Sequence, residues 1–168
     1  MKYAKIIAAD IANGNGFRVS LFVTGCKRNC KGCFNKEAQD PNFGKHFDKE
    51  AKAKIFAELS KDYCAGLSIL GGEPMSILSD NRKQVIDLCK EVKEKFPNKT
   101  IFLWSGYLFN EILGNKDMKD ILNYADVLID GPFVEEQKDL TLKWRGSSNQ
   151  HIVDVAKWRQ TGKVSYIN

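Results

Sequence analysis

The sequence lacks any long apolar segment. No stretch approaches the roughly 18 consecutive apolar residues that indicate a membrane-spanning helix. A brief apolar patch within "MKYAKIIAADIANGNG" is interrupted by Asp10, well short of the core of a signal peptide. We therefore expect a cytoplasmic protein without membrane attachment, whose cysteines are kept reduced and are more apt to bind metal than to form disulfides.

The chain also lacks a block of charge of one sign. Its 26 Lys and Arg residues are scattered among 21 Asp and Glu residues, which leaves a formal net charge of +5. Nucleic-acid-binding proteins concentrate basic residues on one face or in one run, so we expect no nucleic-acid partner. A weakly positive face would instead help an acidic protein partner to dock.

No linker, low-complexity tract or internal repeat divides the sequence. A chain of 168 residues with 43% hydrophobic residues has the size and balance of one globular domain with a proper core. We expect a single domain over residues 1–168.

Apolar or β-branched runs alternate with helical patterns. Strands are predicted at 17–23, 66–70, 100–104, 126–130 and 151–155. Helices are predicted at about 48–60, between "LSDN" and Pro97, and at about 108–123 with a break at Gly114 and Asn115. This alternation predicts a parallel α/β sheet, either doubly wound or an incomplete barrel, because a complete eight-unit barrel needs about 250 residues.

Polar and glycine-rich stretches follow four of these strands. They are "TGCKRNCKGC", "GGEP" (71–74), "SGY" (105–107) and "DGPF" (130–133). In parallel α/β folds the carboxyl ends of the strands carry the functional site. We expect these four stretches to converge at one edge of the sheet.

Three of the five cysteines, Cys26, Cys30 and Cys33, lie on one short loop. A structural zinc site needs four ligands, and His46 could complete such a set only from beyond the loop. A redox Cys-x-x-Cys pair would leave Cys26 unexplained. A 4Fe-4S cluster normally takes four thiolates, so three would leave one iron open to a ligand that is not protein. The missing fourth cysteine is therefore a candidate functional feature.

These residues resemble a known family. The Cys-x3-Cys-x2-Cys spacing followed by Phe34 is similar to the signature of radical S-adenosylmethionine (SAM) enzymes, and "GGEP" resembles their SAM-binding strand end. The stretches "DIANGNGFRVSLFVTGC", "WSGY", "VLIDGPF" and "WRGSSNQ" (144–150) resemble the small activating protein of anaerobic ribonucleotide reductase. The resemblance implies an α/β fold with a mostly parallel sheet, an incomplete, open-sided (β/α) barrel of the radical SAM type. Residues 154–168 lie outside it.

The resemblance also implies a reaction. Cys26, Cys30 and Cys33 would hold one 4Fe-4S cluster whose open iron chelates SAM. One electron from the reduced cluster would cleave SAM to methionine and a 5'-deoxyadenosyl radical, which removes a hydrogen from a glycine of the reductase. The implied partners are the large, glycyl-radical subunit of anaerobic ribonucleotide reductase and a reduced flavodoxin-type electron donor.

Further SAM contacts are expected at "GGEP" and in the cysteine loop. Gly71 and Gly72 would bring backbone groups against the methionyl end of SAM, because no side chain intervenes. Glu73 would accept a hydrogen bond from its ammonium group. Gly32 and Phe34 would contact the adenine by backbone and packing.

Other residues of the strand ends have both a functional and an ordinary interpretation. Ser105 and Asp130 could meet ribose hydroxyls or the methionyl group, although helix caps and turns use the same residue types. Arg145 in "RGSSNQ" could form an ion pair at the mouth of the site or with the partner. The basic residues of the cysteine loop would favour thiolates and oppose the negative charge of a cluster: Lys27, Arg28 and Lys31.

Two alternatives stay open. A small-molecule radical SAM enzyme, such as a 7-carboxy-7-deazaguanine synthase, would share the cysteine and "GGEP" motifs, but such enzymes are usually longer and lack the "RGSSNQ" match. A non-catalytic Fe-S or zinc-binding module would have no use for "GGEP" and would not bind SAM. The remaining cysteines, Cys64 and Cys89, are too few for an auxiliary cluster and are expected to be structural.

Overall fold

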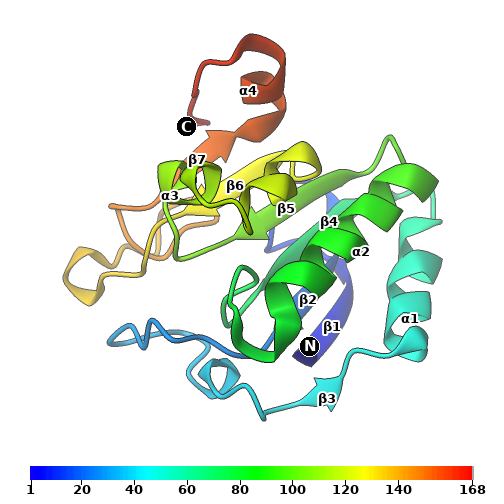
Figure 1. The fold of residues 1–168 in the computed structure, drawn as a ribbon, viewed down its shortest axis with the longest axis horizontal. Helices are drawn as coiled ribbons and strands as arrows, with labels where there is room; N and C mark the ends of the chain where they lie inside the picture. Colours follow the sequence, from blue (N-terminus) through cyan, green and yellow to red (C-terminus); the bar gives the residue numbers. More distant parts are fainter. Residues whose placement is uncertain (168) are drawn as a thin grey trace.

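The computed structural model describes residues 1–167, whose seven strands form one open, mixed sheet (Figure 1). The order across the sheet is β3, β1, β2, β4, β5, β6, β7. Strands β2, β4, β5 and β6 are parallel to one another, whereas β1, β3 and β7 join antiparallel. Their bounds are β1 Lys2–Asp10, β2 Phe17–Val23, β3 Lys45–His46, β4 Cys64–Gly71, β5 Thr100–Trp104, β6 Val127–Asp130 and β7 His151–Asp154. The predicted α/β class is confirmed.

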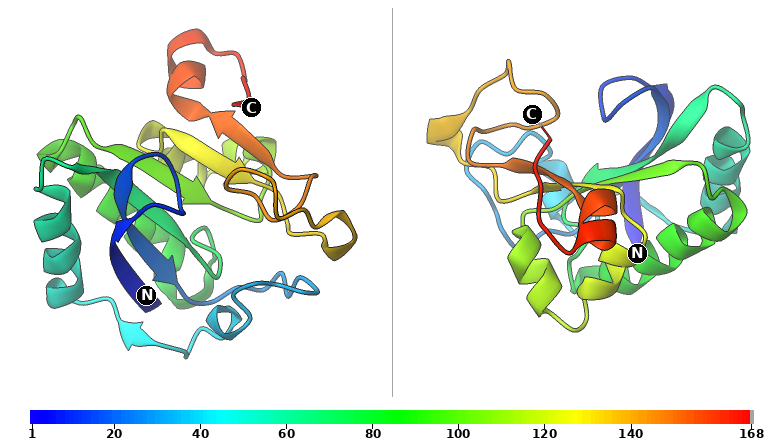
Figure 2. Two further views of the ribbon diagram at one scale, coloured as in Figure 1. Left: turned by 180° about the vertical axis from the view of Figure 1, so that it is seen from behind. Right: turned by 90° about the horizontal axis from the view of Figure 1, so that it is seen from above.

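The helices pack on one face of the sheet. They are α1 (Lys49–Leu59), α2 (Asn81–Lys95), α3 (Phe109–Gly114) and α4 (Val155–Thr161). In the view from above, α2 and α3 lie below the sheet, while the β1–β2 turn and the long loop between β6 and β7 lie above it (Figure 2, right). Within residues 1–167, no helix has the length and apolar character needed to cross a bilayer.

Successive side chains along each strand point to opposite faces of the sheet, which gives the protein two separate apolar clusters. In β2, the side chains of Val19, Leu21 and Val23 belong to the main core beneath the helices, and Ile101 and Leu103 of β5 join them. The opposite, open face carries a smaller apolar cluster, which is Phe102, Val127, Ile129 and Ile152 with Trp104 and Trp144 packed against it. Because helices cover only the first face, the second is left for a binding site.

The predicted elements match the observed ones closely. Strands predicted at 17–23 and 100–104 coincide with β2 and β5, and the other three differ by one or two residues at their ends. The predicted break at Gly114 is confirmed, because α3 ends there and a 3-10 helix follows at Lys119–Asn123. Strands β1 and β3 were not predicted. Of the unplaced residues 154–168, α4 and a bridge between Val153 and Tyr166 are described, and Asn168 lies outside the described residues.

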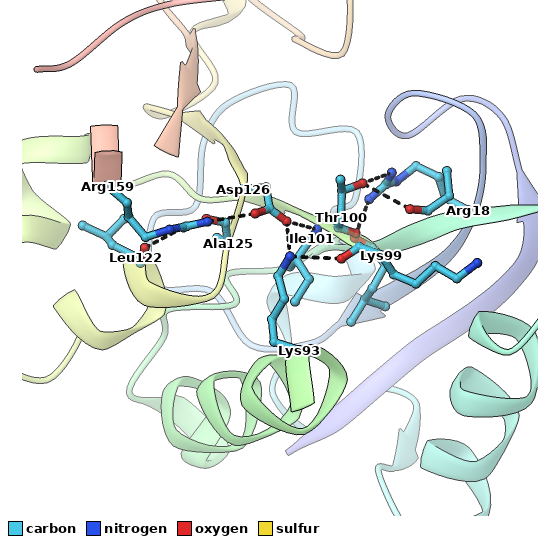
Figure 3. Close-up of polar contacts among 11 residues, drawn as sticks. Arg18, Lys93, Lys99, Thr100, Ile101, Leu122, Ala125, Asp126 and Arg159 are labelled. Carbon is cyan, nitrogen blue, oxygen red and sulfur yellow. Dashed lines mark hydrogen bonds and ion pairs between the residues drawn. The ribbon is translucent and has the colours of Figure 1, made fainter. Parts of the chain in front are cut away.

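Asp126, just before β6, joins three elements on the helix side (Figure 3). Lys93 of α2 donates to Asp126 Oδ2 at 2.6 Å, and the backbone N–H of Ile101 in β5 donates to the same oxygen at 2.8 Å. Arg159 of α4 donates to Asp126 Oδ1 at 2.9 Å and also to the carbonyls of Leu122 and Ala125. The carboxylate therefore anchors α4 to the end of the sheet.

Arg18 is a fully buried cation on the open face. Its Nε donates to Ser68 Oγ at 2.7 Å, and its guanidinium lies 4.1 Å from the centroid of the Phe102 ring. The remaining N–H groups donate to Thr100 Oγ1 and to the carbonyls of Asn15, Leu67 and Thr100 (Figure 3). Burial lowers its pKa to about 10. These bonds hold the β1–β2 turn over the sheet.

We expect Asp126→Ala to lower the free energy of unfolding by about 2–4 kcal/mol, because it leaves two cations and a buried backbone donor without their shared acceptor. Urea denaturation measures this. The control is Asp120→Ala, which removes an exposed carboxylate from the neighbouring 3-10 helix and should change stability by less than about 0.5 kcal/mol. Equal losses in the two variants would contradict the anchoring role of Asp126.

Candidate functional site

The parallel register places the ends of β2 and β4 side by side. Val23, the last residue of β2, pairs with Gly71, the last residue of β4. Beyond the strands, the N–H of Gly72 donates to the Val23 carbonyl at 2.8 Å, and the N–H of Glu73 donates to the Gly25 carbonyl at 3.0 Å. The cysteine loop therefore begins directly against the "GGEP" turn, as the sequence predicts.

Both glycines of this turn are required because neighbouring backbone atoms lie too close to leave room for a side chain. A Cβ on Gly72 would lie 2.5 Å from the carbonyl oxygen of Ala38 and 3.0 Å from the Gly25 nitrogen. Gly71 has φ +114°, and its Cβ would lie 2.4 Å from the Val23 carbonyl oxygen. No side chain fits at either position, so the glycines bring the turn and the cysteine loop into contact whatever ligand binds nearby.

Cys26, Cys30 and Cys33 line one cavity of about 400 Å³ on the open face. That volume is within the usual range for small-molecule and cofactor sites. Five of the residues expected to contact SAM also line it: Phe34, Gly71, Gly72, Glu73 and Ser105. The strand ends thus converge on one cavity, which brings together most of the predicted site.

The three loop cysteines are free and half-buried, whereas Cys64 and Cys89 are buried elsewhere in the core. Burial raises the pKa of the Cys26 thiol, and the nearby Glu73 and Cys30 act in the same direction. Within the described residues, no three His, Cys, Asp or Glu side chains are gathered tightly enough to hold a metal ion. The three thiols nevertheless lie on one loop and line one cavity. Thiolates are soft ligands, which is the ligand type that iron-sulfur clusters require.

Glu73 is the buried acid of the cavity, with 4% of its side chain exposed. Its Oε1 accepts from Ser105 Oγ at 2.8 Å and from the Met75 N–H at 2.9 Å, and its Oε2 accepts from the Gly106 N–H at 2.7 Å. Burial raises the pKa of Glu73, while these hydrogen bonds and Arg28 oppose the rise. Ser105 therefore lines the cavity while directing its hydroxyl at Glu73.

Two predicted residues are placed away from the cavity lining, and a third is at its edge. Asp130 accepts from the Phe109 N–H at 2.8 Å and from His151 Nδ1 at 2.9 Å, so its carboxylate serves the start of α3. Gly32 has φ +69° and lies against Glu135. Phe34 is 57% exposed at the mouth and packs on Phe133 with the ring centroids 5.1 Å apart.

The polar run 145–150 is bonded within its own loop. Gln150 Oε1 accepts from the N–H groups of Gly146 and Ser147, and Gln150 Nε2 donates to the Gly131 carbonyl at 2.9 Å. Arg145 donates to the Gln150 carbonyl at 2.9 Å and lines the cavity. This loop extends beside the cysteine loop (Figure 1), so it forms one side of the mouth.

Sequence reasoning missed several residues of the site. Asn13, Trp104 and Trp144 line the cavity. Arg28 also lines it, with its Nε 4.0 Å from Glu73 Oε2, while Lys31 pairs with Glu135 at 2.9 Å. These basic side chains thus face carboxylates, an arrangement that no local sequence signal indicates.

Comparison with known proteins adds a family to this geometry. The family model described as "4Fe-4S single cluster domain" matches residues 12–153. The anaerobic ribonucleoside-triphosphate reductase-activating protein of Enterobacteria phage T4 is 40% identical over 166 residues, which are 98% of this chain and 97% of that protein. This chain belongs to the family of anaerobic ribonucleoside-triphosphate reductase-activating proteins. Proteins of the same name from Vibrio cholerae serotype O1 and Escherichia coli K12 are 40% and 36% identical over 154 residues, covering 90% of this chain and 97% of each relative.

Membership of the family confirms the resemblance to activating proteins inferred from "DIANGNGFRVSLFVTGC", "WSGY", "VLIDGPF" and "WRGSSNQ". The family-model match begins in the β1–β2 turn and ends in β7, so it contains every residue that lines the cavity. The first strand and α4 lie outside that match, although the alignment with the phage protein extends over 98% of the chain.

We expect Gly72→Ala to lower the free energy of unfolding by about 1–3 kcal/mol, since the new methyl group must push the "GGEP" turn away from Ala38 and Gly25. Gly114→Ala is the matched control, because nothing lies within 4 Å of its added Cβ. We expect it to change stability by less than about 1 kcal/mol. Chemical denaturation of both variants measures the difference, and a stable Gly72→Ala protein would refute the close packing.

Proposed function

We propose that this chain activates an anaerobic ribonucleotide reductase by reductive cleavage of SAM at a 4Fe-4S cluster, which installs a glycyl radical on the reductase. The observation that carries the proposal is the shared cavity: three free thiols of one loop line it together with the "GGE" strand end. The name of the relatives supports the choice of partner. In this proposal the whole chain works as one radical SAM domain in the cytoplasm.

Cys26, Cys30 and Cys33 would be the ligands of the cluster. Their sulfur atoms would have to converge from the positions that line the cavity, and the half-exposed loop leaves them room to do so. A cluster held there would supply one electron for the reductive cleavage of SAM, the chemistry that generates the glycyl radical of the reductase. The chain's own residues hold and orient these groups.

Glu73 would accept from the amino group of SAM. A carboxylate has about four lone-pair sites, and three of those on Glu73 already accept from protein donors. Ser105 would act by fixing Glu73 rather than by touching the ligand itself. Phe34 at the mouth would pack on the adenine. The Asp130 carboxylate is hydrogen-bonded to His151 and to the Phe109 N–H, so we assign it no contact with SAM.

The fold suits a macromolecular substrate. The open sheet leaves one face free of helices, as a partial barrel of the radical SAM type would. The cavity mouth is bordered by exposed apolar side chains, with Leu140 at 76% and Phe34 at 57% exposure. A glycine-bearing loop of the reductase could enter there, while a reduced flavodoxin-type protein would deliver the electron.

We expect Cys30→Ala to lose the cluster and all SAM cleavage, because two thiolates cannot hold the three irons that the proposal requires. The protein is reconstituted anaerobically with iron and sulfide, then given SAM and dithionite, and 5'-deoxyadenosine is quantified by liquid chromatography. Cys89→Ala is the control: Cys89 lies on α2 with its thiol fully buried in the main core, so the substitution should change stability alone.

Product at the wild-type rate from Cys30→Ala would overturn the cluster assignment. An intact cluster in the wild-type protein without product, even after the reductase is added, would identify an electron carrier instead. Zinc bound in place of iron would favour a structural module.

A further inference from the structure

Arg28 lies on the cysteine loop between Cys26 and Cys30, and its side chain reaches across the cavity wall. The guanidinium stacks on Tyr107, with its carbon 4.3 Å from the ring centroid, and it lies against Gly106. Its Nη2 is 3.7 Å from Glu111 Oε2, and its Nε is 4.0 Å from Glu73 Oε2. The side chain is 27% exposed and lines the cavity with the three cysteines.

The guanidinium is close to both carboxylates without being hydrogen-bonded to either. Distances of 3.7 and 4.0 Å exceed those of an N–H···O bond. Among the described residues, Arg28 Nε has no hydrogen-bond partner although the atom is buried. A buried donor left unpaired costs free energy, so such a group in a native cavity indicates an acceptor that arrives with a ligand.

Glu73 does not need Arg28 as a partner. Three protein donors, from Met75, Ser105 and Gly106, already fix its two oxygens. The cavity wall therefore presents one positive and one negative group about 4 Å apart, each with bonding capacity left. An α-amino acid carries the complementary pair, an ammonium and a carboxylate on one carbon.

We propose that Arg28 binds the carboxylate of the methionyl group of SAM while Glu73 takes its amino group, so that the two side chains together recognise the amino-acid end of the ligand. This inference rests on the proposed function. A carboxylate has two oxygens, so one can reach a metal while the other accepts from a guanidinium. Stacking on Tyr107 holds the planar guanidinium of Arg28 in place.

Binding of SAM and of decarboxylated SAM to the cluster-loaded protein tests the proposal. The cluster is kept oxidised so that SAM is not cleaved, and dissociation constants are measured anaerobically, directly for SAM and by competition for the analogue. For Arg28→Gln we expect SAM affinity to fall roughly 10- to 100-fold, as for a lost charge-assisted hydrogen bond, and affinity for the analogue to stay nearly unchanged.

Two further variants separate ligand binding from charge and structure. Lys36→Gln removes an exposed positive charge just beyond the cysteine loop and should leave both affinities unchanged. Arg28→Lys should recover part of the SAM affinity, because an ammonium keeps the positive charge but lacks the paired planar N–H donors of a guanidinium. Iron content and unfolding midpoint are measured for each variant, and we expect both to match the wild type.

An Arg28→Gln protein that binds SAM as tightly as the wild type would overturn the proposal. So would an equal loss of affinity for the two ligands, since Arg28 would then act on the adenosyl part or on the loop as a whole. A loss of SAM affinity that follows a loss of iron would also overturn it. Failure of the loaded wild-type protein to bind SAM would instead contradict the proposed function itself.

Discussion

The parallel alignment of β2 with β4 decides where the chemistry of this chain can occur. Because Val23 pairs with Gly71, the two strands end at the same level, and the loops that follow must share space. They do so by backbone contact, since Gly72 approaches Gly25 and Ala38 more closely than any side chain allows. The cysteines and the buried Glu73 therefore belong to one wall of one cavity. A shift in this register would separate the proposed cluster ligands from the proposed SAM site.

The division of the sheet into two faces gives that cavity its support. Helices cover one face, and the Asp126 carboxylate anchors α2, β5 and α4 there. The other face keeps its polar and aromatic side chains for the site. Arg18 holds the β1–β2 turn over this face with bonds to neutral acceptors, so Asn13 reaches the cavity. The larger of the two apolar cores lies on the helix side, away from the mouth where a protein substrate would enter.

Most of the strands, helices and site motifs could be predicted from local sequence patterns. The elements that were missed depend on pairing between distant parts of the chain. β2 and β5 are dense runs of β-branched and aromatic residues, whereas β1 is half-exposed and β3 is a two-residue exposed bridge without a pattern of its own. The signals for α4 were present, because Asp154 caps its start and Gly162 ends it at φ +69°. The cysteine and "GGEP" motifs are contiguous and were found. Asp130 lies outside the cavity lining because side chains alternate along β6, and its side chain is on the helix side, opposite to Ile129.

The central claim is that three cysteines of one loop hold a four-iron cluster whose remaining iron is open to SAM. Mössbauer spectroscopy of protein reconstituted with isotopically enriched iron, with and without SAM, tests it most directly. We predict one 4Fe-4S cluster per chain in which one iron site is distinct and changes its parameters when SAM is added. A cluster whose irons remain equivalent with SAM, or a loop that takes up a single metal ion in place of a cluster, would contradict the account.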